Sequence, residues 1–207
     1  YGLVGSEMCI RDSDLAILNG NVNFGDLSKS KKLNIGITGG KISYIGTDLI
    51  NGKESIDSNG YEVTPGFLDI HTHSDLSFVV DPDADSKLIQ GVTFELMGNC
   101  GMSFCAPLSK DNKYQLQERL NRYGIKKEMD WNNFDDWLTE IENNTPSINV
   151  AAQIGHGNLR SYVMGMEARQ ANPDELNKMK DEIQKACDQG VLGFSTGLWY
   201  APGSYSS

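Results

Sequence analysis

Long apolar runs, cysteine, histidine and proline are all scarce in this chain of 207 residues. No stretch approaches the about 18 to 20 consecutive apolar residues that a membrane-spanning helix requires, so a membrane protein is not expected. The four cysteines show no paired spacing, and no basic segment followed by an apolar core marks a secretory signal. We therefore expect reduced thiols and a cytoplasmic location.

Positive charge is scarce as well. The chain has 18 lysines and arginines against 28 aspartates and glutamates, which gives a net charge of −10 at pH 7. A balance of this sign argues against nucleic acid and against anionic membranes as partners. This charge balance does not identify a substrate.

Neither end of the chain shows the pattern of a folded element. Residues 1–13 lack helix or strand periodicity and resemble translated read-through of a sequencing adapter, so we interpret them as a non-native leader. The other end stops at Ser207, soon after the glycine and proline of segment 200–203. We expect a piece of a longer protein, and a non-catalytic product of an incomplete gene is one alternative for it.

Residues 14–63 show only strand patterns. Apolar residues alternate over 33–37 and 41–46, on either side of Gly39-Gly40, which predicts a β-hairpin. No helix pattern precedes about residue 84. The sequence therefore predicts a small β-domain over 14–63, ahead of a second domain over 64–207.

Strand and helix patterns alternate after residue 73. Strands are expected over 64–73, 92–97, 148–154 and 191–194, with helices over 83–90, within the polar insertion 109–145, and over 173–189. The last helix has the clearest signals, because Asn172 can cap it and Glu175 completes a capping box. We expect its apolar stripe to face the core: Leu176, Met179, Ile183 and Cys187.

Each predicted strand ends in polar or glycine-rich residues. In a parallel α/β barrel, the carboxyl ends of the strands form the rim that carries the active site. The pattern therefore predicts the N-terminal half of a TIM-like (β/α)8 barrel, with about four of its eight units.

Two of the three histidines lie in the segment 64–73. Since side chains alternate along a strand, His71 and His73 should share one face, with Asp69 on that face too. Two such imidazoles can hold a metal ion, and Asp69 can orient one of them or serve a structural role. An ordinary polar strand–loop junction is the alternative. The apolar lead-in favours the metal site, because buried histidines need partners.

Other polar residues fall at the remaining strand ends. Cys100 is either a small core residue or a metal-binding thiolate. His156, between two glycines, either contacts substrate or makes a structural hydrogen bond. Ser195 lacks the GxSxG pattern of a nucleophilic serine. Arg160 either binds a carboxylate or is a surface arginine at a helix start.

Four segments carry a family resemblance. The segment PGFLDIHTHSD (65–75) resembles the metal-binding first strand of the amidohydrolase superfamily. Three more segments, GVTFELMGNCG, IGHGNLR and GVLGFSTGLWYAPGS, together resemble the N-acyl-D-amino-acid deacylase (D-aminoacylase) branch of that superfamily. The resemblance spans roughly residues 14–207.

This resemblance implies a β-sandwich domain beside a TIM-like barrel, one or two zinc ions, and a small-molecule N-acyl amino acid as substrate. It implies metal ligation by His71, His73 and Cys100. We expect substrate contacts from Tyr200, with His156 and Ser195. The resemblance places further ligands and the general acid/base aspartate beyond Ser207.

A cyclic amidase of the hydantoinase or dihydroorotase type is the alternative within this superfamily. Such enzymes typically carry a carboxylated lysine that bridges two metal ions. The corresponding strands here offer Cys100 and no lysine at the rim, which favours the deacylase branch.

Overall fold

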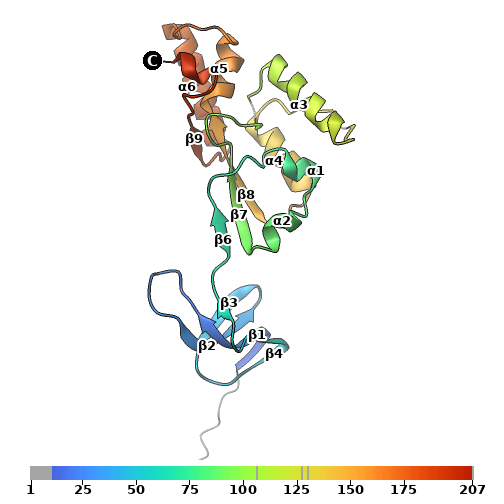
Figure 1. Cartoon of the computed structure of the whole chain (residues 1–207), viewed down its shortest axis with the longest axis vertical. Coiled ribbons are helices and arrows are strands. Elements are labelled where there is room, and N and C mark those ends of the chain that lie inside the picture. Colours follow the sequence, from blue (N-terminus) through green and yellow to red (C-terminus); the bar gives the residue numbers. More distant parts are fainter. Residues whose placement is uncertain (1–10, 106, 127, 130, 207) are drawn as a thin grey trace, which may run out of the picture. The chain divides into compact units, whose positions relative to one another are not determined.

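The computed structural model describes residues 11–105, 107–126, 128–129 and 131–206. The chain divides into two compact units, one up to Pro65 and one from Gly66 onward (Figure 1). Most of the leader predicted over 1–13 lies outside the described residues. Its last three residues, 11–13, belong to the first strand and pair with a neighbouring strand. No helix of the described residues is long and apolar enough to cross a membrane.

The first unit is a β-sheet. Its strands are β1 (Arg11–Val22), β2 (Lys31–Thr38), β3 (Lys41–Gly46), β4 (Ile50–Asp57) and the short β5 (Glu62–Val63). The order β3-β2-β1-β4 combines antiparallel pairs with a parallel β1–β4 pair, and β5 also pairs with β1. The expected hairpin is β2–β3, and both glycines of its turn have positive φ, which residues with a Cβ rarely adopt.

The second unit is an α/β structure with a parallel sheet. The sheet has the order β6-β7-β8-β9, and helices lie between its strands in sequence. The strands are β6 (Phe67–Asp69), β7 (Val92–Met97), β8 (Asn149–Gly155) and β9 (Gly193–Ser195). The helices are α1 (Ser77–Val80), α2 (Asp85–Leu88), α3 (Lys110–Arg122), α4 (Phe134–Asn143), α5 (His156–Met164) and α6 (Pro173–Asp188), followed by a 3-10 turn, Gly203–Tyr205.

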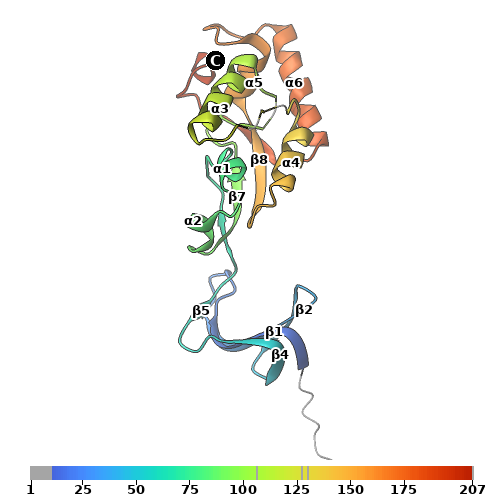
Figure 2. The same ribbon diagram turned by 90° about the vertical axis from the view of Figure 1, so that its right-hand side faces the viewer.

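The core of this unit lies between the sheet and its helices. Phe134, Trp137 and Ile141 of α4 are buried together with Leu116 and Leu120 of α3. In Figure 2, α4 and α6 lie on the same side of β8, and Gln189 after α6 donates a hydrogen bond to Asn133, the cap of α4, at 3.4 Å. Because all four strands are parallel, the loops that follow them meet at one edge of the sheet.

The burial that the sequence implies was wrong at two places, the apolar lead-in to the two histidines and the apolar stripe of α6. Residues 67–70 do not form a buried strand, since Phe67, Leu68 and Ile70 are more than half exposed on the edge strand β6 and the residue after it. In α6, the buried positions are Met179 and Ala186, whereas Cys187 is exposed. The helix is rotated relative to the expected stripe, so Cys187 is not a core residue.

Helix α6 begins with the capping box that the sequence predicts. Asn172 accepts a hydrogen bond from the Glu175 N–H at 2.9 Å, and the Glu175 carboxylate accepts one from the Asn172 N–H at 2.9 Å. Arg169 also donates two hydrogen bonds to Glu175, at 2.6 and 2.7 Å. The hydrogen bonds from Arg169, followed by that from Asn172, lower the pKa of Glu175 to about 2.

This shift predicts a pH dependence of stability. A carboxyl whose pKa falls on folding stabilises the protein above its unfolded pKa, here 4.5, and the gain is lost as the pH falls through about 2. We therefore expect Glu175→Gln, which keeps the polar end group without the charge, to lower the thermal unfolding temperature at pH 6. The difference from wild type should vanish near pH 2. Thermal unfolding at a series of pH values checks this, and a pH-independent difference would contradict it.

Candidate metal centre

The two histidines lie directly after β6 rather than within it. The strand ends at Asp69, but the main chain stays attached to β7, because the N–H of Thr72 donates to the Leu96 carbonyl at 3.3 Å. The Thr72 hydroxyl donates to the same carbonyl at 3.2 Å. Thr72 is buried, whereas His71 and His73 on either side of it are exposed, so the burial expected for the two histidines was wrong. The alternation that the sequence predicts therefore holds beyond the strand.

Cys100 lies in a tight turn after β7, residues 98–101, which we call the cysteine loop. Gly98, Cys100 and Gly101 all have positive φ, at 76°, 56° and 76°. The two glycines adopt this conformation readily, whereas it is unfavourable for Cys100. Such backbone strain is concentrated at functional sites.

The structure brings His71, His73 and Cys100 together. One nitrogen of each histidine and the Cys100 sulfur all lie within 4.8 Å of one another, and this is the one such group of three in the described part of the chain. The His71 Nε2 is 3.2 Å from the Cys100 Sγ, and the two imidazole centroids are 5.9 Å apart. A tetrahedral zinc ion would hold its nitrogen and sulfur ligands about 3.5 Å apart. The three residues therefore fit a metal ion.

Two buried residues that the sequence analysis did not single out lie beside this cluster. Asn99 donates to the carbonyls of Thr72, at 3.2 Å, and Leu96, at 2.8 Å, so it ties the cysteine loop to the histidine segment. Asp75 accepts a hydrogen bond from the Phe104 N–H at 3.2 Å, and burial raises the pKa of its carboxyl. The only sequence signal for Asn99 was its position next to Cys100, and the only signal for Asp75 was its position two residues after His73.

Asp69 does not orient an imidazole. Its carboxylate accepts a hydrogen bond from the His71 main-chain N–H at 3.3 Å and one from Lys87 at 2.9 Å. The hydrogen bond from Lys87 lowers the pKa of Asp69. Asp69 therefore has the structural role that the sequence left open.

Lys87 also neutralises a buried carboxylate. Its Nζ lies 2.7 Å from Glu95, whose side chain is fully buried and which is the register partner of Asp69 in the β6–β7 pair. Neither oxygen of Glu95 has a well-directed hydrogen bond within the described residues, so the Lys87 charge is its compensation. Glu95, followed by Asp69, raises the pKa of Lys87.

His156 lies apart from the metal cluster at the start of α5. Its Nδ1 is 3.2 Å from the Thr196 hydroxyl and its Nε2 is 3.3 Å from the Ser206 hydroxyl. Burial lowers the pKa of its imidazole, and the nearby positive charge of Arg160 adds to this. Both ring nitrogens thus have partners, as a structural role requires.

The other predicted polar residues differ in their surroundings. Ser195 is hydrogen-bonded to the cysteine loop, whereas Tyr200 is about half exposed and its hydroxyl has no partner among the described residues. Arg160 is not a surface arginine: it is 2% exposed and donates to the carbonyls of Glu167 and Arg169. It is therefore not available to bind a carboxylate in this conformation.

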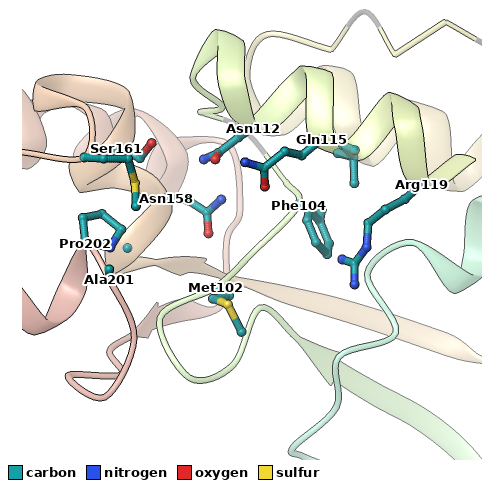
Figure 3. A pocket seen from close by; sticks show the side chains of 12 residues that line it. Met102, Phe104, Asn112, Gln115, Arg119, Asn158, Ser161, Ala201 and Pro202 are labelled. Carbon is teal, nitrogen blue, oxygen red and sulfur yellow. The ribbon is translucent and has the colours of Figure 1, made fainter.

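Two cavities lie beside α3, and one of them reaches the site. The larger, about 450 Å³, lies between α3 and the start of α5, and the amides of Asn112, Gln115 and Asn158 face it (Figure 3). The smaller, about 290 Å³, is lined by His73. Phe104 and Arg119 line both, and the Arg119 guanidinium is 5.5 Å from the Phe104 ring centroid. None of His71, His73 and Cys100 lines the larger cavity.

Comparison with models of protein families shows which family the chain belongs to. A model described as "Amidohydrolase family" matches residues 54–204. This match covers more than half of the chain, so the chain belongs to the amidohydrolase family.

Within this family, the chain is similar in sequence to deacylases of N-acyl-D-amino acids. The chain is 33% identical over 191 residues to a D-aminoacylase of Alcaligenes xylosoxydans xylosoxydans, covering 91% of this chain and 38% of that protein. It is 35% identical to an N-acyl-D-glutamate deacylase of the same organism, with 92% and 38% covered. The chain thus spans about two fifths of the length of these curated relatives.

Solved structures of proteins with the same names as these relatives resemble this chain in fold. A D-aminoacylase crystal structure superposes with a TM-score of 0.82 at 31% identity, over 94% of this chain and 40% of that one. An N-acyl-D-glutamate deacylase from Bordetella bronchiseptica, complexed with zinc and a phosphonate inhibitor, gives a TM-score of 0.80 at 31% identity, over 95% and 41%. The α/β fold of this chain therefore matches that of D-aminoacylase structures.

Proposed function

We propose that this chain is the first part of a zinc-dependent enzyme that hydrolyses the amide bond of N-acyl-D-amino acids, releasing a carboxylate and a D-amino acid. One observation carries the proposal: His71, His73 and Cys100 converge at the strand ends of a chain related to such deacylases. In this proposal the unit from Gly66 onward is the first half of a TIM-like barrel. The unit up to Pro65 is part of a β-sandwich domain.

The donor set suits catalytic zinc. Zinc favours nitrogen and sulfur ligands, and three protein ligands leave a fourth position for water. A zinc ion would supply a water whose pKa falls far below its ordinary value, towards about 7, and a positive charge beside the amide oxygen. His71 and His73 would bind through neutral imidazole nitrogens. Cys100 must give up its proton to bind as the thiolate.

The remaining residues divide between support and substrate binding. Asp69 already accepts hydrogen bonds from Lys87 and from the His71 N–H, which suits a supporting role. As the family resemblance implies, the proton that the departing amine needs would come from an aspartate beyond Ser207. His156 and Ser195 are hydrogen-bonded within the chain. The Tyr200 hydroxyl has no such partner among the described residues, and we propose that it donates to the substrate carbonyl or carboxylate.

The proposal predicts a specific activity. The whole protein encoded by the reading frame that contains this chain should bind zinc and hydrolyse N-acetyl-D-methionine, with N-acetyl-L-methionine as the matched control substrate. The 207-residue chain alone should be inactive, because the proposed proton-transfer group lies outside it. Zinc content by elemental analysis and release of free amine measure the two results.

Other outcomes would assign a different function. A whole protein that hydrolyses only cyclic ureides or imides would be a cyclic amidase. A zinc-loaded whole protein that cleaves neither class would overturn the hydrolase proposal. Removing the metal with a chelator should abolish the activity, and adding zinc should restore it.

A further inference from the structure

Ser195 joins two main-chain groups on opposite sides of Cys100. Its hydroxyl accepts a hydrogen bond from the Gly101 N–H at 3.0 Å and donates one to the Gly98 carbonyl. Gly98 precedes Cys100 by two residues and Gly101 follows it directly, so a single hydroxyl closes the cysteine loop. No other side-chain oxygen of the described residues bonds both of these groups.

The loop needs such support because of its conformation. Cys100 has a φ of 56°, a region that residues with a Cβ occupy at a cost. A strained backbone persists only where the surrounding structure holds it in place. Without the bonds from Ser195, the Cys100 sulfur would lose part of what fixes its position relative to His71.

Ser195 reaches the loop across an intervening strand. It belongs to β9, which pairs with β8, whereas the cysteine loop follows β7. Gly155 is the register partner of Ser195 on β8, and a Cβ at Gly155 would lie 2.7 Å from the main chain of Gly101. A Cβ at Gly197 would overlap the Cys100 carbonyl oxygen. Because residues 155 and 197 are glycines, the main chain at both positions can lie directly against the main chain of the cysteine loop.

We propose that Ser195 is a positioning residue that holds the Cys100 thiolate in place for metal binding. It acts through the cysteine loop and not on the substrate, in contrast to the substrate contact that the sequence suggested. Its single proton, the one it could donate to a substrate oxygen, is already used in the loop, as is one of its two acceptor sites. The inference rests on the proposed metal site and adds a residue that sets the affinity of that site.

The test is metal affinity in the whole protein. Ser195→Ala should bind zinc and cadmium about 10-fold to 100-fold more weakly than wild type, the usual effect of losing a residue that orients a ligand. Competition with a chromophoric chelator gives the affinities, and the ultraviolet thiolate-to-cadmium band reports the sulfur bond directly. Ser195→Thr keeps the hydroxyl and should restore most of the affinity. Thr196→Ala removes the neighbouring hydroxyl, which contacts His156, and should leave metal affinity unchanged.

The outcomes separate this inference from the proposed function. Wild-type affinity and an unchanged cadmium band in Ser195→Ala would overturn the positioning role alone. A wild-type protein without a thiolate band, or with metal binding unaffected by Cys100→Ser, would overturn the metal site itself. If Ser195→Ala does not fold, Gly197→Ala displaces the Cys100 carbonyl instead. It should also weaken metal binding, and wild-type affinity in that variant would overturn the inference.

Discussion

Replacing His71 with alanine should lower the proposed amide hydrolysis by the whole protein at least about 10³-fold, since a catalytic metal contributes several kcal/mol to transition-state stabilisation. The expectation follows from the 3.2 Å approach of His71 Nε2 to Cys100 Sγ, which makes His71 a central member of the cluster. The fall should appear in kcat/KM and in zinc content together, because the variant loses the ion rather than a contact with substrate.

Two cysteine-to-serine substitutions, one inside the cluster and one outside it, test whether Cys100 binds the metal. Cys100→Ser should lower zinc content and activity, because serine offers a poorer ligand for zinc than a thiolate. Cys187→Ser changes an exposed thiol on α6, outside the cluster, and should change neither. Equal effects of the two substitutions would show that cysteine chemistry elsewhere, and not metal ligation by Cys100, explains the loss.

Replacing Lys87 with methionine should destabilise the fold by about 3–5 kcal/mol, the cost of leaving a buried charge without its partner. Glu95 is fully buried, and Lys87 at 2.7 Å supplies its compensating charge. Chemical denaturation of wild type and variant measures the difference in unfolding free energy.

The double variant Lys87→Met with Glu95→Leu tests the cause. Replacing a whole buried pair by apolar residues is often neutral, so the double variant should recover most of the stability. Lys185→Met breaks a pair with Glu182 of the same 2.7 Å length in which neither side chain is fully buried, 66% and 22% exposed, and it should have little effect. A double variant as unstable as the single one would show that Lys87 contributes through packing rather than charge.

Local patterns predicted the elements well. The capping box of α6 was readable because it involves residues three apart in sequence, and the structure confirms it. The hairpin β2–β3 was readable from two glycines between alternating strands. The alternation of His71, Thr72 and His73 also holds, since it depends only on the extended main chain.

Interactions between distant segments could not be read in the same way. The exposure of Cys187 depends on which face of α6 meets α5 and the sheet, and helical periodicity alone does not fix that rotation. Arg160 is buried because carbonyls of the loop after α5 receive its guanidinium. The Lys87–Glu95 pair joins a short helix to a strand interior, and no spacing rule reveals it. The sequence therefore located the proposed ligands but not most of their supports.

Strand β6 also affects how this chain will behave in isolation. It is the first strand in the order of its sheet, and Phe67, Leu68 and Ile70 at this edge are each more than half exposed. An edge strand with accessible main-chain groups and apolar side chains is a template on which another strand can add. We therefore expect concentrated solutions of the 207-residue chain to self-associate through this edge.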